Sequence, residues 1–191
     1  WNATNTYCIA EIIKTDSLGN QQWKKTYGNP LYNNGLAMLC LSDDSCIIAT
    51  YGLANSSEER VNRQMYITKL DLNGNVKWNK TIGFLAIDNW SSWVQKLSDG
   101  SLILSGNKYV KDTITKHIGW LFKLNSNGDS LWYREYEVIH GINESNELWQ
   151  VTPTPDKGFA AAGNLFPQPG NGGQDIWVFK TECSMNTHKE R

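Results

Sequence analysis

"KLDLNGNVKW", Lys69–Trp78, is the stretch of sequence that decides the fold. β-forming residues on both sides of a Gly/Asn-rich centre are typical of a β-hairpin with a tight turn. The alternating polar residues also resemble a calcium-binding loop, but such a loop carries glycine at its sixth position and glutamate at its twelfth. Here Gly74 is only the fourth residue counted from Asp71, so the sequence predicts a turn and not a metal site.

The stretch recurs along the whole chain. "IIKTDSLGNQQWKKTYG", "ITKLDLNGNVKWNKTIG", "LFKLNSNGDSLWYREYE" and the shorter "VFKTECSMN" begin at intervals of 55, 54 and 57 residues, at Ile12, Ile67, Leu121 and Val178. A second hairpin motif alternates with the first and has its turns near Asp43, Asp99 and Asp156. One period therefore holds two hairpins, which makes four short strands.

A four-stranded unit repeated about every 40–55 residues is typical of a β-propeller blade. The sequence predicts one all-β domain over 1–191, with about three and a half antiparallel blades at 1–28 (a half blade), 35–83, 90–137 and 147–182 (incomplete). The turns of the first three copies are predicted to rest on Gly19, Gly74 and Gly128. The recurring tryptophans are predicted to fill the wedges between neighbouring blades, at Trp23, Trp78 and Trp132.

The number of blades leaves three arrangements open. A propeller usually has four to eight blades, because an open ring exposes strand edges. We expect the sequence to be a fragment of a larger propeller. Alternatively, the N-terminal strands complete the last blade of a small four-bladed ring, or two copies assemble into one ring.

Composition excludes several classes of function. The sequence has 18 Lys and Arg residues against 19 Asp and Glu residues, which gives no electrostatic attraction to nucleic acid. No apolar run approaches the ~18 residues that a membrane span needs, so no membrane insertion is expected. The four cysteines form no C-x-x-C pair, and we expect neither a metal nor a cofactor. Cys40 and Cys46 flank a predicted turn and form either a disulfide or a pair of buried free thiols.

The longer connections define the face on which we expect a ligand. They join the second strand of a blade to the third at 52–64, 107–118 and 164–175, and one blade to the next at 29–35, 84–90 and 138–146. In an antiparallel blade both kinds of connection leave on the same side, and loops on a rigid scaffold commonly carry function. The candidate ligand-binding residues on this face are Tyr32, Arg60, Trp90, Lys111, His117, His140 and Phe166.

The alternation of "SDGSLILSGN" with "YITKLDLNGNVKWNKTIG" resembles the secreted β-propeller repeats of Bacteroidota. The resemblance covers nearly the whole chain and implies an exported or cell-surface protein associated with type IX secretion. It implies no catalytic residues. It also draws attention to three Asp-Ser/Thr-apolar matches to the O-glycosylation pattern of that phylum, which are either glycosylation sites or chance matches, at Ser17, Thr113 and Ser130.

The sequence predicts a binding protein and not an enzyme. It contains no G-x-S-x-G, H-E-x-x-H or phosphate-loop motif. We expect a non-catalytic, extracytoplasmic scaffold that binds a protein or a glycan through the face defined above. Its partner would be another protein or the remainder of its own chain. The alternative is an accessory domain of a larger secreted hydrolase, either a glycosidase or a protease.

Overall fold

The computed structural model describes residues 10–27, 33–41, 45–53, 63–82, 88–111, 115–137, 145–166 and 173–182. Within these ranges all regular structure is β-strand, and no helix that could span a membrane is present. Four residues singled out from the sequence lie outside the described ranges: Tyr32, Arg60, Thr113 and His140.

The described strands form four antiparallel sheets in sequence order. The first sheet is a hairpin of β1 (Ala10–Thr15) and β2 (Gln21–Tyr27). The second contains β3 (Asn33–Cys40), β4 (Cys46–Leu53), β5 (Arg63–Leu70) and β6 (Val76–Ile82). The third contains β7 (Asp88–Lys96), β8 (Leu102–Lys111), β9 (Thr115–Leu124) and β10 (Ser130–Tyr136). The fourth contains β11 (Ser145–Pro153), β12 (Phe159–Phe166) and β13 (Asp175–Thr181).

The opening stretch forms the turn between β5 and β6. Oδ1 of Asp71 accepts hydrogen bonds from the backbone N–H groups of Asn73 at 2.9 Å and Asn75 at 2.8 Å. These bonds to Asn75 and Asn73 lower the pKa of the Asp71 carboxyl, because they favour its ionised form. The Asp71 carboxylate therefore stabilises the turn by accepting hydrogen bonds from the backbone that follows it, as in an Asx turn.

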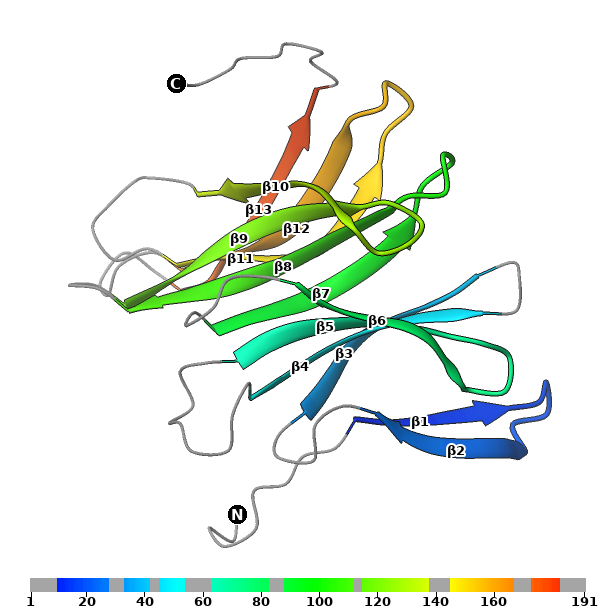
Figure 1. Ribbon diagram of the computed structural model, residues 1–191. Helices are drawn as coiled ribbons and strands as arrows, with labels where there is room; N and C mark the ends of the chain where they lie inside the picture. Colours follow the sequence, from blue (N-terminus) through cyan, green and yellow to red (C-terminus); the bar gives the residue numbers. More distant parts are fainter. Residues whose placement is uncertain are drawn as a thin grey trace, which may run out of the picture.

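The four sheets stack in sequence order, with the first hairpin at one end and the fourth sheet at the other (Figure 1). β7 contacts β3, β4 and β5 of the sheet before it, and β11 contacts β7, β8 and β9 in the same way. The N-terminal hairpin does not complete the fourth sheet, so the small closed ring is not the arrangement in this structure.

The third sheet is buried on both faces. Trp120, Phe122 and Leu124 of β9 pack in one apolar cluster with side chains of the second sheet. Leu121, between them, packs in a second cluster with Leu148 of the fourth sheet. Because successive strand residues point to opposite faces, this alternation joins three sheets through one strand.

The glycine turns fit against the tryptophans of the preceding sheet. Trp23 of β2 donates a hydrogen bond from Nε1 to the carbonyl of Leu72 at 3.2 Å. A Cβ on Gly74 would lie 2.9 Å from the Trp23 ring, and a Cβ on Gly128 would lie 2.8 Å from the ring of Trp78. The repeated Gly and Trp positions therefore meet between sheets.

The strands can be compared with the limits predicted from the sequence. The inner strands, β3, β7 and β11, are the first strands of the last three sheets. They begin at 33, 88 and 145, close to the approximate blade starts predicted at 35, 90 and 147, and each contains a β-bulge. The predicted connection 107–118 is mostly strand, since β8 runs to Lys111 and β9 starts at Thr115.

Candidate functional site

Two of the predicted ligand-binding residues come together at one end of the third sheet. Trp90 of β7 packs edge-on against His117 of β9, with ring centroids 5.2 Å apart and planes at 87°. The sequence predicted both residues in connections, whereas the structure places both in strands. Phe166, at the end of β12, pairs in register with Ser145, whose hydroxyl accepts a hydrogen bond from the His117 backbone N–H at 3.0 Å. Lys111 is the last residue of β8.

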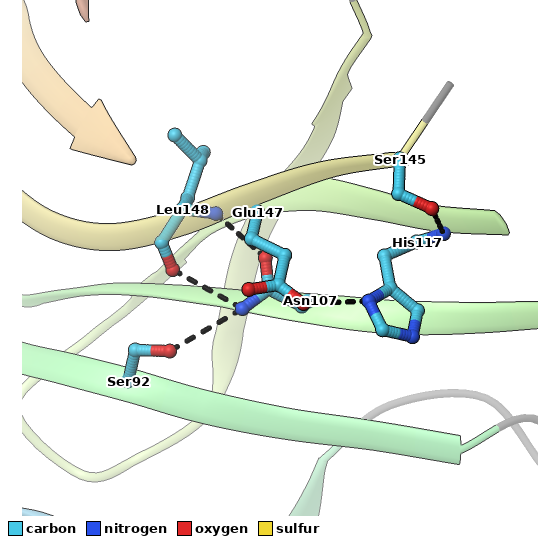
Figure 2. Close-up of polar contacts among 6 residues, drawn as sticks. All are labelled: Ser92, Asn107, His117, Ser145, Glu147 and Leu148. Carbon is cyan, nitrogen blue, oxygen red and sulfur yellow. Dashed lines mark hydrogen bonds and ion pairs between the residues drawn. The ribbon is translucent and has the colours of Figure 1, made fainter. Parts of the chain in front are cut away.

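The imidazole ring of His117 contacts the carboxylate of Glu147 from the next sheet (Figure 2). Nδ1 of His117 lies 2.6 Å from Oε1 of Glu147. The side chain of Glu147 is only 10 % exposed, whereas that of His117 is 30 % exposed. Because an ionised carboxylate only accepts hydrogen bonds, Nδ1 carries the proton in this contact, and Nε2 is left for another interaction.

A second aromatic ring borders the same histidine. Tyr109 of β8 is paired in register with His117, and the two ring centroids are 5.5 Å apart. Tyr109, Trp90 and His117 are all half-buried. Three neighbouring strands thus supply two aromatic rings around an imidazole, and the next sheet supplies the carboxylate.

A buried amide fixes the strand that carries Glu147. Asn107 of β8 accepts a hydrogen bond from the Leu148 N–H through Oδ1 at 2.6 Å, and its Nδ2 donates to the Leu148 carbonyl at 3.3 Å. Nδ2 also lies 3.4 Å from Oγ of Ser92 (Figure 2). Since Leu148 follows Glu147 directly, Asn107 sets where the carboxylate lies relative to His117.

Two glycines at equivalent repeat positions admit the bulged inner strands. A Cβ on Gly106 would lie 2.2 Å from the carbonyl oxygen of Trp90, and a Cβ on Gly163 would lie 1.7 Å from that of Glu147. No side chain fits at those distances, so glycine lets the backbone of β7 and β11 come close to the neighbouring strand. The bulges that follow orient both Trp90 and Glu147.

This arrangement suits recognition of a polar ligand with an apolar face. Within the described ranges, the contact of this pair joins Nδ1 of His117 to Oε1 of Glu147, and neither Nε2 nor Oε2 makes a hydrogen bond. The nearby Ser145 hydroxyl accepts a hydrogen bond from the His117 backbone N–H. Among the described side chains, no three His, Cys, Asp or Glu residues form a group that could hold a metal ion.

Sequence reasoning missed Tyr109, Glu147 and Asn107. Glu147 stands in the strand "SNELWQV" directly before Leu148 and Trp149, and an acidic residue beside apolar strand residues is a usable signal of a buried carboxylate. Asn107 follows Gly106 as Asn164 follows Gly163, so its recurrence was also visible. Tyr109 carries no such signal, because its contact with His117 depends on strand register.

The remaining candidates lie away from this cluster. Cys40 and Cys46 are opposite each other in register, and their Sγ atoms lie 3.3 Å apart without a disulfide bond between them. Ser17 is exposed in the first turn, and Ser130 is exposed at the start of β10.

Comparison with known proteins identifies no family for this chain. The sequence matches no protein-family model and no curated protein.

Proposed function

We propose that the protein is a non-catalytic binding module whose four sheets are successive blades of a β-propeller. The repeat supports this assignment, because each unit forms its own sheet and that sheet packs against the sheet of the next unit. Its resemblance to secreted repeats of Bacteroidota supports an extracytoplasmic location. The ligand site is the cluster of Trp90, Tyr109, His117 and Glu147, and the favoured ligand is a glycan.

The observation that carries the proposal is the pairing of aromatic rings with free polar atoms. The C–H face of a sugar stacks on an aromatic ring, while its hydroxyls bond to carboxylate and imidazole atoms. Trp90 and Tyr109 supply the rings, and Nε2 of His117 and Oε2 of Glu147 supply the polar atoms. A peptide carrying hydroxyl and apolar side chains is the other ligand that this chemistry accepts.

A glycan array probed with the whole protein tests the proposal. We expect binding to a subset of oligosaccharides, weakened at least about tenfold, or ~1.4 kcal/mol, by Trp90→Ala and by His117→Ala. Trp149→Ala is the matched control, because Trp149 is an exposed tryptophan on β11 outside the cluster, and it should leave binding unchanged. Glycan binding that survives both cluster substitutions, or no binding to any oligosaccharide, would contradict the proposal.

A further inference from the structure

The fourth sheet has one covered face and one uncovered face. On β13, Trp177 and Phe179 pack into the apolar cluster shared with the third sheet. The alternating residues Ile176 and Val178 point the other way and are 84 % and 67 % exposed. Two large apolar side chains side by side on one strand are unusual at a surface that only meets water.

Val178 occupies a repeat position that is buried in the two preceding sheets. Ile67 and Leu121 begin their copies of the repeat as Val178 begins the fourth, and both are 0 % exposed. Ile67 lies in the cluster that joins the second sheet to the third, and Leu121 in the cluster that joins the third to the fourth. The position therefore makes the contact from each sheet to the following one.

Asn164 repeats the amide that holds one sheet to the next. It follows Gly163 in "AAGN" as Asn107 follows Gly106 in "LSGN". Asn107 bonds both backbone groups of Leu148, immediately before the bulge of β11. Asn164 is half-buried, and its side chain makes no hydrogen bond within the described ranges. Its amide is thus positioned for a bulged inner strand that the described residues do not supply.

We infer that the uncovered face of β11–β13 receives one further four-stranded sheet of this same repeat, whose bulged inner strand bonds to Asn164 and covers Val178. Continuity with the internal interfaces carries the inference, because the position of Val178 makes this contact at both of them and the position of Asn164 makes it between the third and fourth sheets. A second copy of the present chain is a poorer occupant. The hairpin β1–β2 at its opposite end corresponds to the outer strands of a repeat unit and has no bulged inner strand. This inference is independent of ligand binding at Trp90 and His117.

The test adds a three-stranded copy of such a sheet, preceded by a copy of β10 that extends the fourth sheet. Residues 1–181 are followed by a second copy of 125–191, which keeps the repeat in register because Thr181 corresponds to Leu124. In this extended chain we expect Asn164→Ala to lower the urea midpoint as much as Asn107→Ala lowers it in the original chain. In the original chain Asn164→Ala should leave the midpoint unchanged. Amide exchange of β12 and β13 should slow in the extended chain.

Asn73→Ala serves as the matched control, because the Asn73 side chain is exposed and makes no hydrogen bond within the described ranges. It should leave the midpoint unchanged in both chains. The inference is overturned if Asn164→Ala has no effect in the extended chain, or if the added strands stay unprotected from exchange. It is also overturned if native mass spectrometry finds the original chain as a dimer that Val178→Lys returns to monomer, since the face would then belong to a second copy.

Discussion

Asn107 shows how one buried side chain connects the fold to the site. Its amide satisfies the N–H and the carbonyl of Leu148, next to the carboxylate that faces His117. Buried amides of this kind rigidify a structure when every partner is satisfied, and they are costly when one is removed. The same residue therefore contributes to stability and to the geometry of the cluster.

Asn107→Ala should destabilise the protein by about 2–6 kcal/mol, because two buried backbone groups lose their partner at about 1–3 kcal/mol each. Asn164→Ala removes an equivalent amide that bonds nothing in the described structure, and it should change stability by less than about 0.5 kcal/mol. Urea unfolding of the two variants measures both values. Equal losses from the two substitutions would show that Asn107 does not hold the sheets together.

Acid should destabilise the protein through its turn aspartates. Hydrogen bonds from the Ser101 hydroxyl and backbone N–H, assisted by Lys123, lower the pKa of Asp99 from 3.8 to about 2. The folded state binds a proton at the Asp99 carboxylate less tightly than the unfolded state does. The contribution of Asp99 to the free energy of unfolding is therefore present above about pH 4 and is lost as the pH falls toward 2. Asp99→Asn should lower stability at neutral pH and reduce its loss on acidification, measured by urea unfolding at pH 7, 4 and 2.5. An unchanged pH profile would contradict this reading of Asp99. The other turn aspartates with lowered pKa values keep part of the acid sensitivity in the variant, and these are Asp16, Asp71, Asp129 and Asp156.

At the scale of the element, the turn between the two outer strands also acts as an inter-sheet contact. Gly74 and Gly128 have φ angles of 72° and 82°, and each lies against aromatic side chains of the preceding sheet. Gly19 has a similar φ of 86°, but a Cβ there would meet nothing within 4 Å. The three turns therefore share a backbone conformation and differ in what surrounds them.

Alanine substitutions at the three glycines separate these two contributions. Gly19→Ala should cost only the backbone strain of a left-handed alanine, about 1–2 kcal/mol. Gly74→Ala and Gly128→Ala should each cost about 1–3 kcal/mol more, because the new Cβ overlaps a tryptophan ring and forces the sheets apart. Thermal or urea unfolding of the three variants gives the comparison. A loss at Gly19 as large as at Gly128 would mean that the turn conformation alone matters.

The sequence predicts the hairpins well because their chemistry is local. Gly74 and its Asn and Asp neighbours are among the few residues that favour a tight turn, and alternation over 120–124 predicts burial on both strand faces. The bulges in β3, β7 and β11 could not be predicted in the same way, since one extra residue has no composition of its own.

For the whole molecule, the sequence indicates which face carries the candidate site but not which residues contact one another on it. Trp90 and His117 were predicted on that face, and the structure brings them into contact. Their partner Glu147 comes from the next sheet, about thirty residues later than His117, and the contact depends on how Asn107 and Gly163 set the inner strand. Contacts between sheets follow from packing, which a single sequence does not display.

The central claim is that the four sheets pack one on the next in sequence order and that the outer face of the fourth sheet is uncovered. Thiol accessibility at three equivalent positions tests this claim most directly. With the four native cysteines replaced by serine, single cysteines are introduced as Ile67→Cys, Leu121→Cys and Val178→Cys. Circular dichroism first confirms that each variant keeps a β-sheet spectrum, and labelling by a maleimide is then timed with and without urea. We predict that the cysteine at 178 reacts as fast in the folded protein as in urea, whereas those at 67 and 121 react only on unfolding. Fast labelling at 121 in the folded protein, or protection at 178, would contradict the account.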